Sequence, residues 1–300
     1  MAAKKKMLSK LKSAVAKRGQ PKKKAAKKKP AKPSQSSAAG APRDATAPAR
    51  PAAQAAAGRG EEAPADSERE TQGQQALREF TPDELEHILD RHRLWVTSKS
   101  KEGERANLGR CNLREQYLQG AVLRGCDLRD SNLQKAELQN VDLFLADLRS
   151  ADLLEALLDK ANLKKVKGSG ANFVGAKMRE GILEEAVLDR ADFRRSDLCE
   201  ANLQHAILKK ARFQEANLFM ADLQHADLEG ADLEGADLKG ANLCEANLEG
   251  ANLRRAKMQG CELFETNLRG ADLRDVEGLG NDDLEDALTD DETQGPESTV

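Results

Sequence analysis

The chain has 300 residues, a formal net charge of −3 and an aromatic content of only 3%. No apolar run is long enough to cross a membrane as a helix, which excludes an integral membrane protein of that type. The charges are segregated: residues 1–33 hold 14 Lys and Arg and no acid, whereas residues 276–300 hold nine acids and no base. Such asymmetry predicts that the two ends bind charged partners.

The five cysteines do not suggest a secreted, disulfide-bonded protein. Cys111, Cys126, Cys199, Cys244 and Cys261 form no C-x-x-C pair, and their number is odd. The basic N-terminus lacks the apolar stretch that follows the first charges of a secretory signal. We therefore expect a cytoplasmic protein with reduced thiols.

Residues 1–75 are rich in Lys, Ala, Pro, Ser and Gly, with almost no large apolar side chain after Val15. They are predicted to form a disordered basic arm. Its Lys runs, which resemble the tails of linker histones and bacterial histone-like proteins, are Lys22, Lys23, Lys24, Lys27, Lys28 and Lys29. Such an arm would neutralise nucleic-acid phosphates without reading sequence. Two alternatives stay open: a solvated tail without a partner, or an anionic membrane surface bound through the weak stripe of Met7, Leu8, Leu11 and Val15.

Residues 76–105 are predicted to form a capping helix and a linker. Thr81 is the expected N-cap, Pro82 lies at N1, and Glu84 at N3 completes a capping box, which places the helix over residues 81–97. One face of this helix is formed by Leu85, Ile88, Leu89, His92, Trp95 and Val96. We expect this face to cover the first turn of the segment that follows, because an open edge would recruit another strand. The alternative is a helix that binds a partner.

Residues 106–275 repeat every five residues without losing register. Of the 34 units, 33 carry Leu, Phe or Met at the third position, and Gly168 is the exception. The first position is small, and 24 of the 34 residues there are Ala. A period of five matches neither an amphipathic helix nor an ordinary strand, so it predicts a repeat architecture.

The period can be converted into a shape. In an extended unit the first and third side chains point inward and the second outward, which leaves two residues for a turn. If each turn bends the chain by about 90°, four units close one coil of 20 residues, and coils stack at about 4.8 Å. Phe173, Phe193 and Phe213, the inward Phe residues, are spaced by 20 and would stack on one face. Gly at the last position of ten units, as in Gly230, suits a turn with positive φ.

The runs Ala-Asp-Leu-Glu-Gly (231–235) and Ala-Asn-Leu-Cys-Glu (241–245) resemble the pentapeptide-repeat family, whose pattern is A(D/N)LXX. The resemblance implies an all-β fold, a right-handed quadrilateral β-helix of about 8.5 coils over residues 106–275. Its structural core would include the residues Phe173, Phe193, Phe213, Leu223 and Leu233.

Residues 276–300 are predicted to be an acidic tail. Asp282–Leu288 is expected to form a short helix that covers the last coil with Leu284 and Leu288. The acidic continuation, Asp290–Glu292, is expected to stay solvated.

The sequence shows no catalytic constellation. It contains no G-x-S-x-G, Walker or H-E-x-x-H motif, and a rod filled with Leu offers no cleft, so we expect neither an enzyme nor a cofactor. The single G-x-G, Gly168 to Gly170, predicts a kink or bulge in one coil. We expect no metal centre either; the one candidate is the column of His205, His225 and Glu245, which could share a divalent metal or sense pH. The alternative is a polar outer column without a ligand.

Residues 215–249 form an acidic zone with nine acids and one base, Lys239. Its candidate interaction residues are Asp222, Asp227, Asp232 and Asp237. Some members of the family resemble a DNA duplex in size and charge, and bind DNA gyrase and protect it from quinolones. Here the zone covers less than two coils, and bases come just before it, namely Arg194, Arg195, Lys209, Lys210 and Arg212. Ordinary solvating charge, a docking patch for a protein and a duplex mimic are the alternatives.

The leading hypothesis is therefore a non-catalytic interaction scaffold, tethered to nucleic acid by its Lys-rich arm. A protein partner is expected but not identified, and the pattern leaves the oligomeric state open. The alternatives are a DNA-mimicking modulator of a type II topoisomerase, a scaffold at an anionic membrane surface, or an arm that folds back on the chain's own acidic regions.

Overall fold

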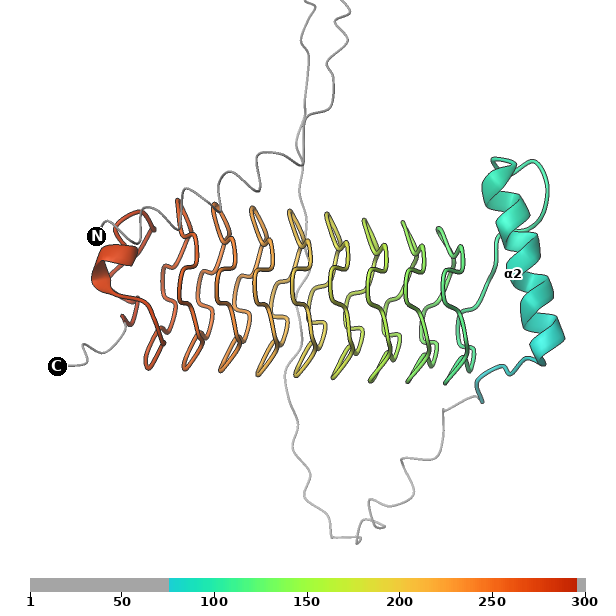
Figure 1. Cartoon of the computed structure of the whole chain (residues 1–300), viewed down its shortest axis with the longest axis horizontal. Helices are drawn as coiled ribbons and strands as arrows, with labels where there is room; N and C mark the ends of the chain where they lie inside the picture. Colours follow the sequence, from blue (N-terminus) through green and yellow to red (C-terminus); the bar gives the residue numbers. More distant parts are fainter. Residues whose placement is uncertain (1–75, 296–300) are drawn as a thin grey trace, which may run out of the picture. The chain divides into compact units, whose positions relative to one another are not determined.

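The computed structural model describes residues 76–295. The predicted basic arm, with its Lys runs, lies outside the described residues. Residues 106–275, called the rod below, form stacked coils, and helix α2 (Pro82–Thr97) lies at the end where the rod begins (Figure 1). The regular structure of the rod consists of isolated parallel β-bridges, one residue per unit.

The bridges give the rod four faces. Between the first and last coils, the second residue of a unit pairs with the residues 20 before and 20 after it, as in Asn202↔Asp222 and Asp222↔Asn242. Every fourth unit therefore lies on the same face, and the predicted coil of 20 residues is confirmed. We number the faces by their first bridge residue: face 1 begins at Asn107, face 2 at Asn112, face 3 at Tyr117 and face 4 at Val122.

A tight turn forms each corner between two faces. The first N–H of the next unit donates to the carbonyl of the central residue, as Ala121 does to Leu118 at 3.0 Å. The last residue of every unit, from Arg110 to Asp275, has a positive φ. A positive φ at the third turn residue is the mark of a type II turn. The ten glycines fit this requirement as predicted, but the turn forms with non-glycine residues in the other 24 units.

The Asp or Asn at the second position has a local role. Its side-chain oxygen accepts the N–H of the residue two places on; the Gln224 N–H, for example, donates to Asp222 Oδ1 at 3.2 Å. An Asn one coil on adds a second bond, because Asn242 Nδ2 donates to the same oxygen at 3.2 Å. Side chains of this kind satisfy turn donors that the bridges leave unpaired, which explains why the repeat favours Asp and Asn.

The interior is filled with the central side chains. Phe173, Phe193 and Phe213 are fully buried and stack with ring centroids 4.8 and 4.9 Å apart, so the predicted ladder is confirmed. Leu223 and Leu233 are buried as well.

The prediction of a kink at Gly168 is wrong. Lys167 bridges Val187, and the Gly168 N–H donates to the Val187 carbonyl at 2.7 Å, as in a regular unit. A Cβ at Gly168 would come within 2.8 Å of Leu188 Cδ2. The side chain of the next coil thus occupies the space that the glycine leaves, and the backbone needs no adjustment.

Helix α2 closes the first coil. Its Thr81–Glu84 capping box is present as predicted, and Leu85 and His92 are buried. His92 Nδ1 accepts the Ala106 N–H at 3.1 Å, so the helix satisfies a donor of the first unit. Arg78 adds a bridge to Cys111, which the sequence pattern did not indicate.

The end of the rod differs from the prediction. In place of a helix over 282–288, a 3₁₀ turn, η1 (Asn281–Asp283), precedes residues that continue the coil. Leu288 bridges Asn267 and Gln294 bridges Asp272, so the chain pairs with two faces of the last coil. Leu284 packs against the core as expected, but Leu288 is exposed because its backbone serves as an edge strand. Asp290, Asp291 and Glu292 are exposed, as predicted.

Candidate functional site

The rod can meet partners only through the second, fourth and fifth residues of its units, because the first and third fill the interior. The bridge register places these outward residues in columns, one residue per coil. Any binding site on the rod is therefore a set of residues 20 apart, together with the neighbouring column.

The His column lies at the corner between faces 4 and 1. The rings of His205 and His225 stack with centroids 4.7 Å apart and planes inclined by 9°. His225 Nδ1 lies 3.2 Å from Glu245 Oε2. Because stacked rings hold their nitrogen lone pairs in parallel planes, the pair does not converge on one point. Within residues 76–295, no group of three or more His, Cys, Asp or Glu side chains is arranged to hold a metal ion.

The acidic zone is a belt and not a patch. Asp222 lies on face 4, Asp227 on face 1, Asp232 on face 2 and Asp237 on face 3, so the four candidates point in four directions. One flat partner can therefore contact only one or two of them. Sequence position alone suggested a cluster, and the 90° turn between consecutive units separates its members.

These four aspartates are also engaged locally. Asp222, Asp227 and Asp232 each accept an Asn Nδ2 from the next coil, at 3.0 to 3.2 Å. Asp227 also lies 3.1 Å from Lys209 Nζ, and Asp237 lies 3.6 Å from Lys239 Nζ. Much of the acidic zone's charge thus serves turns and ion pairs within the rod.

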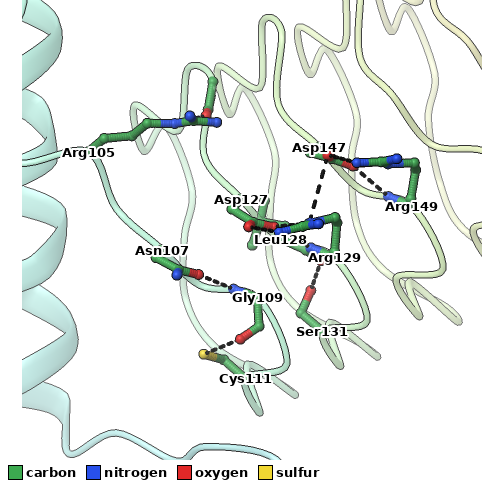
Figure 2. Close-up of polar contacts among 11 residues, drawn as sticks. Arg105, Asn107, Gly109, Cys111, Asp127, Leu128, Arg129, Ser131, Asp147 and Arg149 are labelled. Atoms are coloured by element: carbon green, nitrogen blue, oxygen red, sulfur yellow. Dashed lines mark hydrogen bonds and ion pairs between the residues drawn. The ribbon is translucent and has the colours of Figure 1, made fainter.

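Arginine two residues after an aspartate neutralises it in place. Figure 2 shows this arrangement on face 1, where Arg129 donates to both oxygens of Asp127 at 2.8 and 2.5 Å, and Arg149 binds Asp147 in the same way. Arg129 also approaches Asp147 of the next coil at 3.8 Å. The hydrogen bonds from Arg129 hold the pKa of Asp127 below its usual value. Charges of this kind are largely cancelled before a partner arrives.

Most bases at the last position of a unit are compensated by an acid in the next coil. Eight such residues occur in the rod, and six have an acid 20 residues on, at the same corner of the next coil. Contacts follow for Lys135 with Glu155, Lys160 with Glu180, and Lys165 with Glu185, at 3.5, 3.5 and 3.0 Å.

Arg190 and Lys210 are the two exceptions to this rule. Lys210 stands one coil after Arg190, and Gly230 stands one coil after Lys210. Both cations are exposed, and within residues 76–295 neither makes an ion pair or a side-chain hydrogen bond. They line a surface hollow of about 540 Å³ together with Ser169, Gly170, Asp189, Lys209 and Glu229. Position along the chain singles out Lys210 but not Arg190, and only a comparison of residues 20 apart finds the pair.

The cysteines of the rod form no disulfide, and burial keeps two of the thiols protonated. Cys111, Cys126, Cys199, Cys244 and Cys261 are all free, and burial raises the pKa of Cys126 and of Cys261 to about 12. These two stay protonated near neutral pH and act as small core side chains. Among the described helices, none has the length and apolar character that crossing a membrane requires.

Comparisons with known proteins agree with the repeat. The chain matches the family of pentapeptide repeats in eight copies, over residues 106–143, 146–184, 183–214, 200–235, 221–260 and 236–275. No curated protein sequence matches it significantly.

Solved structures show the same similarity. HetL, a pentapeptide repeat protein involved in heterocyst differentiation regulation in Nostoc sp. strain PCC 7120, is 34% identical, over 56% of this chain and 82% of that one, with a TM-score of 0.21. A pentapeptide repeat protein from the Arabidopsis thaliana thylakoid lumen is 39% identical over 36% of this chain and 72% of its own, with a TM-score of 0.25. Full-length QnrB1, a plasmid-mediated fluoroquinolone resistance protein, is 19% identical over 58% and 92%, with a TM-score of 0.31.

Proposed function

We propose, on the premise that this chain belongs to the pentapeptide repeat family, that it is a non-catalytic scaffold which its Lys-rich arm tethers to nucleic acid. The observation that carries the proposal is the union of 14 bases in residues 1–33 with a rod whose interior is filled by side chains. The arm supplies affinity through phosphate neutralisation, which is independent of sequence. The rod supplies a rigid surface for a protein partner, and we place the protein in the cytoplasm.

The rod suits this task because its specificity resides in columns of outward side chains. Its core is fixed by the repeat, whereas the outward residues vary from coil to coil. A filled interior leaves no deep cleft for a small substrate, which favours binding over catalysis.

The tether can be tested in the full-length chain. A variant in which Lys22, Lys23, Lys24, Lys27, Lys28 and Lys29 are changed to Gln is compared with the wild type by fluorescence anisotropy on short duplex DNA. If the arm contacts phosphates, the variant binds more weakly and its affinity depends less steeply on salt. Equal affinity and equal salt dependence would contradict the tether. Stronger binding of the wild type to vesicles of anionic lipid than to DNA would favour the membrane alternative.

A DNA-mimicking modulator of a type II topoisomerase is the rival function. Such a mimic needs rows of uncompensated negative charge, whereas the acidic zone here encircles the rod and is partly paired with bases. The geometry therefore favours the scaffold. A supercoiling assay with gyrase checks this: we expect no change at saturating protein, and inhibition or protection from a quinolone would revive the mimic.

A further inference from the structure

We infer that Arg190 and Lys210 form a phosphate-binding site on the rod, which holds the nucleic-acid backbone at the corner between faces 1 and 2. This inference rests on the proposed tether, because it adds a second, fixed contact to the one that the arm makes. The exposed hollow beside these residues would then bind the phosphates of a nucleic-acid strand.

The local pattern of charge at this corner differs from that of the rest of the rod. Like charges directly opposite each other on neighbouring strands destabilise a sheet, and the rod avoids this for its other bases at the last position of a unit. At Arg190 and Lys210 it stacks two cations one coil apart, at about 4.8 Å between strands. Nothing in the fold requires this, since the same position accepts Glu, Gly or Ser elsewhere. A bound anion would remove the repulsion.

The two cations are accessible to a large ligand. Gly170 precedes Arg190 by one coil, and a Cβ placed there would meet no atom within 4 Å. Gly230 follows Lys210, and the Lys210 side chain lies over it, with Cγ 3.5 Å from the position of a Cβ. The two cations are therefore bordered by residues without side chains, and the corner stays open to a large ligand.

Two acids, Asp189 and Glu229, also line the hollow. Glu229 forms an ion pair with Lys209 Nζ at 2.6 Å. Hydrogen bonds to Glu229 and Asp227 raise the pKa of Lys209. Asp189 accepts the hydroxyl of Ser169 at 3.3 Å. Both acids therefore have side-chain partners of their own, and neither carboxylate pairs with the side chain of Arg190 or Lys210. The charge that the hollow offers to a ligand is positive.

The chemistry of the pair suits phosphate. A guanidinium and an ammonium side by side can bind two oxygens of one phosphate. They can also bind two neighbouring phosphates of one strand, one each. On the adjoining face 2, Arg194 and Arg212 share the single carboxylate of Asp192, at 2.7 and 3.2 Å, which leaves one of the two positive charges uncompensated. A polyanion can thus continue from the corner along face 2.

The test is the salt dependence of DNA binding by the full-length double variant R190Q/K210Q. Each phosphate contact contributes about 0.9 to the slope of log K against log salt, so losing two should lower the slope by about 1.8. The matched control is K135Q/K160Q, which removes two cations from the same position of the repeat where acids already pair with them. We expect the control to keep the wild-type slope. A charge-preserving variant, R190K/K210R, should keep it too, and thermal unfolding confirms that all three fold.

Equal slopes for R190Q/K210Q and its control would overturn the inference, because general electrostatics would then explain both. The variant in which the six Lys of the arm are changed to Gln, called the arm variant, distinguishes failure of the rod site from failure of the tether. If the arm variant loses binding and R190Q/K210Q does not, the tether stands and the rod site fails. If only R190Q/K210Q weakens binding, the rod site stands and the arm tether fails. Competition by inorganic phosphate at constant ionic strength is expected to be weak; displacement of DNA at low phosphate would instead indicate a site for the free anion.

Discussion

At the last position of every unit in the rod, φ lies between 53° and 73°. An L-residue in this left-handed region brings its Cβ close to a carbonyl oxygen and costs about 1–2 kcal/mol. The rod accepts this cost in its non-glycine units because the turn is fixed by hydrogen bonds to both neighbouring coils. The same position is exposed in most units, so the residues that vary at the surface are also the residues with a strained backbone.

A matched pair of substitutions measures that strain. Gly125 and Leu145 are successive members of one column, with φ of 64° and 59°, and Leu145 is 49% exposed. Leu145→Gly should stabilise the rod by about 0.5–1 kcal/mol, since the relief of strain exceeds the entropy that glycine loses. Gly125→Ala should destabilise it by about 1 kcal/mol through strain alone, because its Cβ would touch nothing within 4 Å. Urea midpoints give both values, and shifts of the same sign would contradict this account.

The Phe ladder predicts a graded loss of stability. Phe193 stacks between Phe173 and Phe213 and is fully buried. Phe193→Ala should lower the free energy of unfolding by about 3–5 kcal/mol, because it removes most of the side chain and leaves a cavity. Phe193→Leu should cost less, since Leu fills this position in the adjacent units. Thermal unfolding compares the two, with Phe219→Leu, at a 40% exposed position, as the neutral control. A larger loss for Leu than for Ala would refute the stacking argument.

Among the elements, helix α2 was the most predictable from sequence. Its Thr81, Pro82 and Glu84 signals act within one turn, so no knowledge of the fold was needed. The bridge of Arg78 could not be foreseen, because a single paired residue has no period. The expected helix over 282–288 failed for a tertiary reason. The open backbone of the last coil offers partners such as the Leu268 N–H, which donates to Leu288 at 2.8 Å. These bonds outweigh the weak helix tendency of so short a segment.

The α2 cap should respond to pH through His92. This side chain is fully buried and accepts the Ala106 N–H, and burial lowers its pKa from the ordinary 6.5. The unfolded chain therefore takes up a proton before the folded cap does. The cap's contribution to stability is full above pH 6.5 and declines as the pH falls below that value.

Amide exchange checks this expectation. The protection factor of the Ala106 amide should fall with acidification in the wild type, because a protonated Nδ1 cannot accept its hydrogen bond. The variant His92→Gln should flatten the pH dependence, whereas His87→Gln, at an exposed position of the same helix, should leave it unchanged. A wild-type profile as flat as that of His92→Gln would contradict the role of His92.

At the scale of the molecule, the sequence predicted the fold closely and the candidate site poorly. The repeat determined the coil, the faces and the core, because each depends only on counting by five and by 20. The acidic candidates Asp222 and Asp227 looked adjacent along the chain, yet the turn between them places them on different faces. Arg190 and Lys210 are separated by 20 residues, and only their shared corner makes them a pair.

The end of the rod gives a prediction about association. Residues 286–294 satisfy donors of the last coil, among them the N–H groups of Glu265, Leu268 and Leu273, at 2.8 Å each. Removing residues 281–300 would expose these edge groups and delete a cluster of acids that repels other chains. We expect concentration-dependent association by light scattering, whereas Asp291→Asn, which keeps the edge covered, should behave like the full chain. A truncated chain that associates no more than the full chain would show that the edge is protected in another way.

Because four units make one coil, the corner on which an outward residue lies depends on the number of units before it. The interior positions do not depend on that number. Deleting one whole unit, such as residues 196–200, would leave each remaining central side chain in an equivalent interior position. Every later column would nevertheless move to the adjacent corner, because each unit turns the chain by a quarter of a coil. Glu215 would then follow Arg190 where Lys210 now stands. A family built this way can exchange one recognition surface for another by gaining or losing five residues, with no point mutation at the site itself.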